Sequence, residues 1–317
     1  GQGVANVALV VAVASAAGPT VAAAILSVAT WPWLFLVNIP VGLLALAVAS
    51  RTLPVTPASG RPFDRVSAIL NALTFGLLII GIDGLGDPEG QRIAVAELAG
   101  ALVIGAVFVR RQIRLPAPLL PVDLLRIPAF ALSMATSVAS FCAQMVSYVA
   151  LPFYFQDVLH LSSTQTGFLL TPWPIAVAAM APVSGRLADR YPPGILGGIG
   201  LAMMAAGLVC MTLLPAAPAT LDIVWRLTLC GLGFGLFQSP NNKVIVTSAP
   251  RERAGGASGM QSTARLTGQS LGAALVAVIF GLTHGLGADR AVTLSLSCAV
   301  ALAVIGGCAS VLRRSRR

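Results

Sequence analysis

Residues 222–242, DIVWRLTLCGLGFGLFQSPNN, decide the fold. With the residues just before them they give an apolar run over 219–240, and a helix needs roughly 20 mainly apolar residues to cross a bilayer. The run holds two charged side chains, Asp222 and Arg226, on one face of a helix. Because a charge inside a span is costly, it is commonly functional. Two interpretations follow: the pair neutralises itself, or Arg226 tunes a protonatable carboxylate on another helix.

Similar apolar runs on both sides predict about ten spans in all. Short gaps rich in Pro and Gly separate them, and the apolar residues show no sustained alternation of period two. The fold class that we expect is therefore an all-α polytopic membrane protein. The expected limits are 4–26, 33–50, 66–86, 93–112, 129–152, 166–187, 193–214, 219–240, 257–282 and 290–311.

The composition agrees with the bilayer as the main solvent. Of the 317 residues, 56% are hydrophobic and 10% are charged, whereas soluble domains carry roughly 25% charged residues. The net charge of +9 sits in short gaps between apolar runs. A nucleic-acid surface would need clustered basic residues with interleaved aromatics, so no nucleic-acid partner is expected.

The arginines fall on alternate gaps and predict the orientation. One side collects Arg51, Arg61, Arg65, Arg110, Arg111, Arg114, Arg126, Arg186, Arg190, Arg251, Arg253 and the tail from Arg313 to Arg317, whereas the opposite gaps hold Arg92 and Arg290. Basic loops stay on the cytoplasmic side. We therefore expect a multi-pass protein of the plasma membrane, which in bacteria is the inner membrane, with its C-terminus in the cytoplasm. The tail RRSRR is interpreted as a topology anchor, or as a patch for anionic lipid.

Neither metal nor enzyme chemistry is expected. The five cysteines lie in apolar runs without CxxC spacing, and His160 and His284 have no second ligand nearby in sequence. No HExxH, GxSxG or paired intramembrane carboxylate occurs. We therefore expect no cofactor and no enzymatic activity.

Five stretches carry a resemblance to a known family. They are AAGPTVAAA with Gly18 and Pro19, WPWLFLVNIPVG (31–42), GRLADRYPPG (185–194), the opening stretch 222–242, and RERAGGASGMQSTARLTGQSLGAAL (251–275). In order and spacing they resemble the major facilitator superfamily, specifically the fourteen-span drug:proton antiporters of the EmrB/QacA type. Ala22 and Ala23, Pro32, and Pro192 with Pro193 depart from the usual motif residues.

The resemblance implies a division of the chain. Residue 1 is Gly and falls near the start of the fifth helix of that family, so we expect about ten of fourteen helices and a missing N-terminal part. Residues 1–50 would hold the last two helices of the N-terminal half. Residues 51–127 would be a linker with two inserted helices, and 128–317 the C-terminal six-helix half.

The resemblance also implies export of cationic or amphipathic drugs in exchange for protons, by rocking of two halves about a central cavity. Gly18 and Pro19 would form the antiporter motif, and Gly185, Arg186, Asp189 and Arg190 a cytoplasmic gating loop. Asp189 would lie against a helix N-terminus, and Arg186 or Arg190 would pair with carboxylates of the adjoining helix. The coupling acids of this family often lie in the first helix, which precedes residue 1.

The cavity candidates are polar, aromatic or Met side chains within spans, since aromatic faces attract organic cations and Met adapts to varied shapes. They are Phe141, Gln144, Met145, Tyr148, Phe153, Tyr154, Phe237, Gln238, Asn241, Asn242 and Gln269. Two other functions remain open: a truncated, non-transporting remnant or scaffold, and a major facilitator importer of another small solute.

Overall fold

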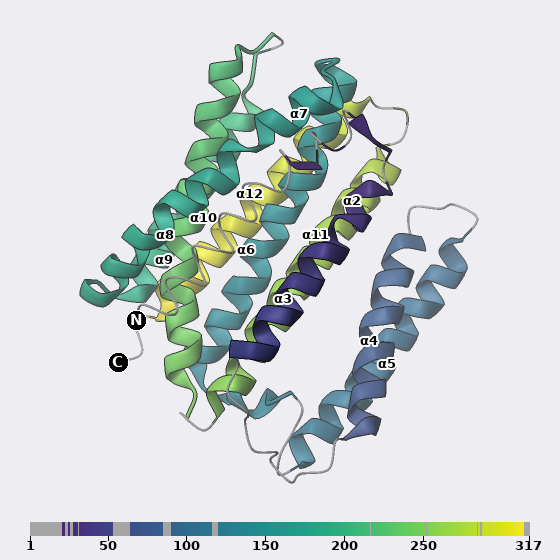
Figure 1. Ribbon diagram of the computed structural model, residues 1–317, viewed down its shortest axis with the longest axis vertical. Coiled ribbons are helices and arrows are strands. Elements are labelled where there is room, and N and C mark those ends of the chain that lie inside the picture. Colours follow the sequence, from purple (N-terminus) through teal and green to yellow (C-terminus); the bar gives the residue numbers. More distant parts are fainter. Residues whose placement is uncertain are drawn as a thin grey trace.

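The computed structural model describes residues 21–22, 25, 28–30, 32–52, 64–84, 90–115, 120–215, 217–250, 253–283, 285 and 287–313. Within these ranges the chain is helical apart from short connections (Figure 1). Nine helical segments of this part are long and apolar enough to cross a membrane, by length and composition. The tenth span, expected at 4–26, lies largely outside the described residues, so the count of ten remains a prediction.

The helices follow the expected runs closely. The first segments are α2 (Trp33–Leu36), α3 (Asn38–Thr52), α4 (Arg65–Asp83) and α5 (Gln91–Arg114), followed by the 3-10 helix η2 (Val122–Arg126). The remaining elements are α6 (Pro128–Phe153), the π-helix η3 (Tyr154–Val158), α7 (Ser163–Leu170), α8 (Pro172–Arg190), α9 (Pro193–Thr212), α10 (Thr220–Ser248), α11 (Ala254–Leu282) and α12 (Ala288–Leu312).

Helix α10 is longer than the expected span 219–240, because it continues through Pro240 to Ser248. A proline inside a helix removes the hydrogen bond to the carbonyl four residues earlier, here that of Leu236. The hydroxyl of Ser184 on α8 donates to this carbonyl oxygen at 2.9 Å, and the contact is buried. A neighbouring helix thus satisfies the group that Pro240 leaves free, and α10 can continue.

The expected span 166–187 is two helices in the structure. Ser162 caps the start of α7 through a capping box with Gln165, and α8 begins anew with Pro172 in its first turn. A proline is well tolerated at the first helical position and poorly further in, which places the break at Thr171.

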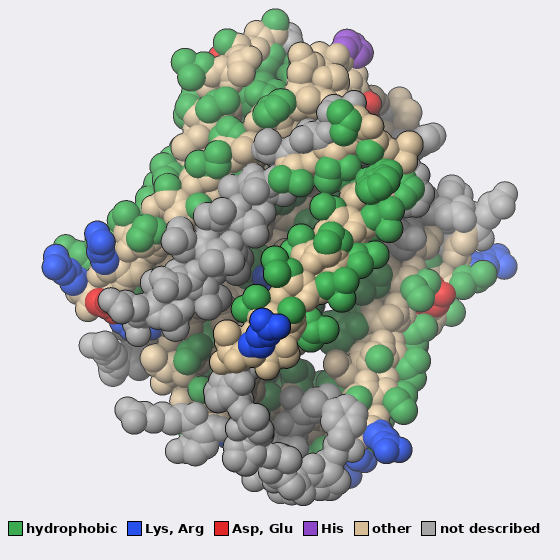
Figure 2. Space-filling model, viewed as in Figure 1, with side chains coloured by type: hydrophobic (Ala, Val, Ile, Leu, Met, Phe, Trp, Pro, Cys, Tyr) green, Lys and Arg blue, Asp and Glu red, His purple; other side chains and the backbone are tan. Residues whose placement is uncertain are grey.

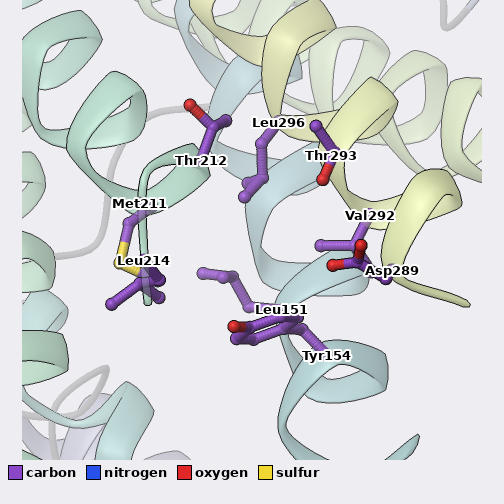
Figure 3. Close-up of a pocket in the computed structure, with 9 residues that line it drawn as sticks. All are labelled: Leu151, Tyr154, Met211, Thr212, Leu214, Asp289, Val292, Thr293 and Leu296. Carbon is purple, nitrogen blue, oxygen red and sulfur yellow. The ribbon is translucent and has the colours of Figure 1, made fainter. Parts of the chain in front are cut away.

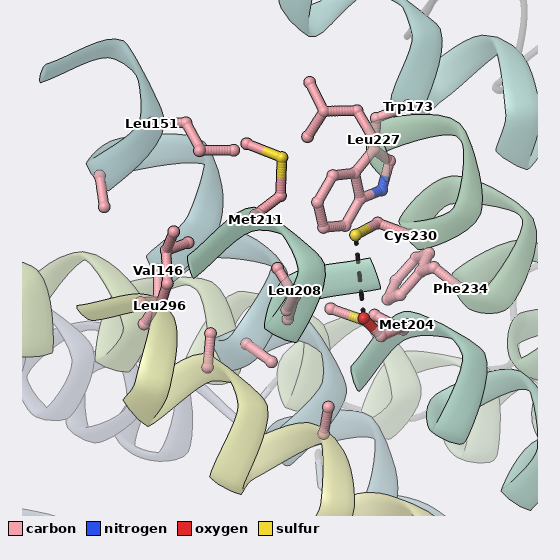
Figure 4. Close-up of a cluster of buried hydrophobic side chains, with 14 of the residues drawn as sticks. Val146, Leu151, Trp173, Met204, Leu208, Met211, Leu227, Cys230, Phe234 and Leu296 are labelled. Carbon is pink, nitrogen blue, oxygen red and sulfur yellow. Dashed lines mark hydrogen bonds between the residues drawn. The ribbon is translucent and has the colours of Figure 1, made fainter. Parts of the chain in front are cut away.

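Helices α6 to α12 form a bundle with one large cluster of buried apolar residues and two smaller ones. Helix α10 packs against α8, α9 and α6, while α6 packs against α11 and α12, and α12 against α9. The core contains Trp173, Leu208, Leu227 and Phe234, all at most 2% exposed. Figure 4 shows these side chains converging, with the thiol of Cys230 donating to the carbonyl oxygen of Met204 at 3.8 Å.

Glycines let α9 and α10 approach with their backbones in contact. A Cβ atom added to Gly200 would lie 2.5 Å from the carbonyl oxygen of Gly233, and one added to Gly233 would lie 2.5 Å from that of Gly200. Small residues at such crossings are a common device of helices packed within membranes.

Helices α3, α4 and α5 are less buried than the bundle. Helix α3 contains no buried residue, and its apolar side chains are exposed along the length of the helix in Figure 2. Helices α4 and α5 pack on each other and reach the bundle through α11 and η2. An apolar surface of this kind suits lipid or further protein.

The two ends of the helices differ in charge. Arg51, Arg114, Arg190 and Arg313 lie at the ends of α3, α5, α8 and α12, and we call this side the basic end. Helices α4, α6, α9 and α11 begin on the same side. The opposite side is called the far end.

At the basic end of α4, Asp64 accepts hydrogen bonds from the backbone N–H and hydroxyl of Ser67, and from Arg111 of α5. The two bonds from Ser67, with a further contribution from Arg111, lower the pKa of Asp64 to about 2. Gln112 also donates to the Ser67 hydroxyl at 2.7 Å. These contacts join α4 to α5 at one end.

Candidate functional site

One face of helix α6, which we call the α6 wall, carries aromatic and amide side chains and packs against α8 and α10. The ring of Phe141 meets that of Phe234 on α10 edge-on, with centroids 5.3 Å apart. Tyr148 meets Trp173 on α8 in the same way at 5.2 Å. Gln144 lies on the same side of α6 and is half-buried, as are Met145 and Tyr148.

The other candidates near the end of α6 lie away from this wall. Phe153 is exposed, and its ring packs against Phe280 of α11 at 4.9 Å. Tyr154 opens the π-helix η3 beside Phe155. The structure therefore brings Phe141, Gln144 and Tyr148 together and places Phe153 and Tyr154 at the far end.

Candidates on α10 and α11 differ in exposure. Phe237 and Asn241 are each 1% exposed, so neither offers surface to a solute in this conformation. Gln238 and Asn242 on α10 and Gln269 on α11 are half-buried. Gln238, Asn242 and Gln269 therefore remain the accessible candidates on these two helices.

A buried polar junction at the basic end explains the position of Asn241. Its side-chain N–H groups donate to the hydroxyl of Ser137 at 2.8 Å and to the carbonyl oxygen of Ser133 at 3.3 Å, both on α6. Its side-chain oxygen accepts from Arg313 at 2.7 Å. Asn241 thus joins α10 to α6 and to the end of α12.

Arg313 is the centre of this junction, although the sequence analysis placed it in a tail interpreted as a topology anchor or a patch for anionic lipid. The guanidinium group donates to the hydroxyls of Ser133 at 2.6 Å and Ser310 at 2.7 Å, in addition to Asn241. The Ser310 hydroxyl donates onward to the carbonyl oxygen of Gly194 on α9 at 3.1 Å. Four helices meet through this one side chain.

The acceptors of Arg313 are all neutral within the described residues. Burial lowers the pKa of Arg313 to about 10, which leaves the group charged at neutral pH. Its function here depends on a planar fork of N–H donors, which lysine cannot reproduce. Small polar residues repeated in α6, at 133 and 137, were the one sequence signal for the junction. We call the group Ser133, Ser137, Asn241, Ser310 and Arg313 the Arg313 junction.

The expected gating loop lies at the end of α8. Asp189 accepts from Lys243 of α10 at 2.6 Å, and the same ammonium group donates to the carbonyl oxygen of Ala188 at 3.0 Å. The side chain of Asp189 is largely exposed in this contact. Arg186 and Arg190 take part in none of the four ion pairs found within the described residues. The partner of Asp189 is thus a lysine on α10.

A second ion pair closes the basic end of the bundle near η2. Arg253, just before α11, donates through both terminal nitrogens to the carboxylate of Asp123, one contact measuring 2.7 Å. These bonds from Arg253 lower the pKa of Asp123. The fork-to-fork geometry is the strongest form of such a pair.

The pair Asp222–Arg226 sits at the far end of α10 and is loose. The nearest charged atoms are 3.7 Å apart, and the indole of Trp225 lies beside the guanidinium group. Two nitrogens of Arg226, Nε and Nη1, are buried without a hydrogen-bond partner within the described residues. The ion pair therefore leaves part of the guanidinium group of Arg226 without a hydrogen-bond partner, and both interpretations of the pair remain predictions.

A small pocket opens at the far end between α6, α9 and α12 (Figure 3). Its volume is about 40 Å³, and Tyr154 and Asp289 contribute its polar side chains together with two threonines. This pocket is far smaller than the roughly 300 Å³ or more that sites for drug-sized ligands occupy. It does not serve as the solute site in this conformation.

Two further points complete the predicted site. Gly18 and Pro19, the expected antiporter motif, lie outside the described residues. Within the described part of the chain, no group of three or more His, Cys, Asp or Glu side chains could hold a metal ion.

Nine helical segments of spanning length within the described residues define a polytopic membrane protein by length and composition. A comparison with known families matches residues 1–273 to the Major Facilitator Superfamily. The chain belongs to this superfamily, whose members transport small-molecule substrates across membranes.

Three relatives illustrate the range of similarity. The chain is 56% identical to the uncharacterized transporter YebQ of Escherichia coli (strain K12), over 99% of this chain and 68% of that protein. It is 30% identical to the multidrug efflux pump LfrA of Mycolicibacterium smegmatis, over 84% of this chain and 53% of that protein. It is 27% identical to the riboflavin transporter RibZ of Clostridioides difficile, over 86% and 59%. The chain thus spans between about half and two thirds of these relatives.

Proposed function

We propose that the protein carrying this chain exports amphipathic organic compounds, drugs and dyes among them, across the plasma membrane in exchange for protons. The observation that carries the proposal is the α6 wall, where Gln144 and Tyr148 are half-buried beside the buried ring of Phe141. A binding surface of aromatic faces with few amide groups suits flat amphipathic molecules. Similarity to the multidrug efflux pump LfrA supports the same reading.

The basic end is proposed to face the cytoplasm, because arginine-rich loops stay on that side. Cysteines introduced singly into the turns at 87–92 and 186–191 test this orientation in intact cells. An impermeant thiol reagent added outside should label the first turn and spare the second. Equal labelling of both turns would contradict the orientation.

Export itself is tested by the accumulation of ethidium in cells that make the whole protein. We expect lower accumulation than in control cells, with the difference abolished when the proton gradient is collapsed. A Tyr148→Ala variant, which removes the ring facing Trp173, should lose export while still reaching the membrane. Accumulation unchanged by expression of the protein would count against drug export and favour a non-transporting scaffold.

A second candidate is transport of a nutrient-like solute, favoured by similarity to the riboflavin transporter RibZ. Riboflavin is also flat and carries hydrogen-bonding groups, which Gln144 and Gln269 would suit. Uptake and efflux of labelled riboflavin in the same cells separate the two functions, since drug export predicts movement of ethidium and no movement of riboflavin.

A further inference from the structure

Arg265 is the charged side chain that lies deepest along any described helix. It is eleven residues past the start of α11 at Ala254 and seventeen residues before its end at Leu282. Residue 268 is the midpoint of this 29-residue helix, so at 1.5 Å per residue Arg265 lies about 5 Å along the axis from the middle of the span. By contrast, Arg226 and Glu97 lie six residues from a helix end, and Lys243 lies five.

The side chain of Arg265 is exposed, and it takes part in none of the four ion pairs found within the described residues. An unpaired charge at this depth is expensive if it faces lipid. The direction in which Arg265 points therefore decides its meaning.

Helix packing gives that direction. Helices α6 and α11 both begin at the basic end and so run parallel, in contact through Gly268 and Gly272, which touch the α6 backbone near Cys142. Consider two parallel helices in contact, viewed along their axes. The faces that point to the same side of the pair lie clockwise from the contact on one helix and anticlockwise from it on the other. The turn on α6 leads to Phe141 and Tyr148, which face α10 and α8. The opposite turn on α11 leads to Arg265 and Gln269.

Arg265 also belongs to a polar stripe on α11. Ser258, Ser262, Arg265 and Gln269 recur at intervals of four, three and four residues, so they share one side of the helix. Three of them are exposed and Gln269 is half-buried. A polar stripe in a membrane helix belongs beside water or a solute, not beside lipid tails.

We propose that Arg265 binds a carboxylate or similar oxyanion within the pathway between α6, α10 and α11. A guanidinium group holds two oxygens of such a group at once, and at this depth the contact is shielded from bulk water. The anion has two possible sources: an acidic group on the transported solute, or a carboxylate elsewhere in the protein that carries the coupled proton. The inference rests on the proposed transport function for its role, and on the position of Arg265 for its chemistry.

The test measures the charge around Arg265 without measuring transport, so that failure of the proposed export leaves the result readable. In the whole protein with its native cysteines replaced, Gln269→Cys places a thiol one turn from Arg265. Its reaction rates with a sulfonatoethyl and a trimethylammonioethyl methanethiosulfonate are compared in membrane vesicles, at pH 7.5 and pH 5. The first reagent is an anion and the second a cation.

If the anion comes from the solute, Arg265 stands unpaired in the absence of solute. The anionic reagent should then react faster at both pH values, and Arg265→Gln should lower the ratio of the two rates about tenfold or more. If the anion is a carboxylate of the protein, the ratio should be near one at pH 7.5 and rise at pH 5. Arg265→Gln should lower the ratio to below one at pH 7.5, where the carboxylate is left unpaired, and to near one at pH 5.

Two variants control the measurement. Arg190→Gln, at the exposed end of α8, should leave the ratio unchanged, and Arg265→Lys should keep most of it because the charge is retained. If Arg265→Gln does not reach the membrane, Arg265→His carries the test in one folded protein, since its charge is lost between pH 5 and pH 8. The proposal is overturned if Arg265→Gln leaves the ratio of the two rates unchanged, or if the ratio in the Arg265→His variant does not depend on pH. So does a thiol at 269 that reacts with neither reagent.

Discussion

The basic end and the far end of the bundle are held by different forces. At the basic end, the Arg313 junction connects α6, α9, α10 and α12, while Lys243 and Arg253 each bind a carboxylate. At the far end, the ion pair Asp222–Arg226 is loose at 3.7 Å, and aromatic contacts such as Phe153–Phe280 join the helices. Directional bonds at one end and apolar contacts at the other mean that this conformation is fixed mainly at its basic end.

The difference matters for a transporter that opens alternately to two sides. Opening at the basic end requires hydrogen bonds and ion pairs to break. Opening at the far end requires mainly that apolar side chains slide past one another, which breaks fewer hydrogen bonds. Five changes test this contrast, and they are given in order of the effect expected.

Replacing Arg313 with Gln should have the largest effect. It removes the donors that satisfy buried oxygens of Ser133, Asn241 and Ser310, which are at most 1% exposed. Buried groups without partners cost roughly 1–3 kcal/mol each, so a loss of about 3 kcal/mol in the free energy of unfolding is expected. Thermal unfolding of the purified whole protein measures it, with Arg190→Gln as the control that should change nothing.

Asn241→Ala should be nearly as damaging, at about 2 kcal/mol, since it leaves the Ser137 hydroxyl and one Arg313 N–H unpaired. Because the two residues bond directly, the double variant with Arg313→Gln should be less unstable than the sum of the single changes. Strict additivity would show that the junction does not act as a unit.

Acid should weaken the contact between η2 and α11. The pKa of Asp123 is lowered in the folded protein by Arg253, so the pair stabilises the fold above the ordinary carboxyl pKa of 3.8 and this contribution is lost as the pH falls below it. The pair is partly exposed, and its value should not exceed about 1 kcal/mol. Asp123→Asn should remove this part of the dependence of unfolding temperature on pH, while Asp157→Asn, a far-end carboxylate, should not.

Breaking the pair Asp189–Lys243 should alter motion more than stability. Both side chains are well exposed, and exposed ion pairs contribute little to folding. We expect Asp189→Asn to leave the unfolding temperature unchanged within error, yet to speed the reaction of an Asn242→Cys thiol with a reagent supplied at the basic end. An unchanged reaction rate would mean that this ion pair does not hold the end closed.

Arg226→Met should have the smallest effect on stability. The guanidinium group has two buried nitrogens without partners, so an apolar chain of similar length is expected to be neutral or slightly stabilising. A fall in unfolding temperature comparable to that of Arg313→Gln would show that the far end is as strongly held as the basic end.

Much of the fold was predictable from the sequence because the bilayer imposes it. Helix lengths follow from membrane thickness, and all nine observed segments overlap an expected span. The errors concern backbone groups that another helix satisfies. The sequence suggested that α10 ends at Pro240. Nothing in it showed that the hydroxyl of Ser184, on another helix, would donate a hydrogen bond to the Leu236 carbonyl oxygen.

The site was less predictable, because it depends on side-chain direction. Arg313 was grouped with the tail, yet it turns back between α6, α10 and α12, which are separated by many tens of residues in sequence. Asn241 was expected in the cavity for its polarity and instead is buried in the junction. Gln144 and Tyr148 do lie on one wall, and whether they contact a solute remains a prediction.

The bond from Ser184 to the Leu236 carbonyl gives α10 an unusual mechanical character. A proline alone makes a helix easier to bend at that point, but here a hydroxyl on α8 bonds the carbonyl group that Pro240 leaves free. Any bend of α10 must stretch that bond or draw α8 along with it, so the two helices flex in step. The resistance of α10 to bending thus depends partly on a residue of α8. Ser184→Ala would remove the bond and let the two helices bend independently.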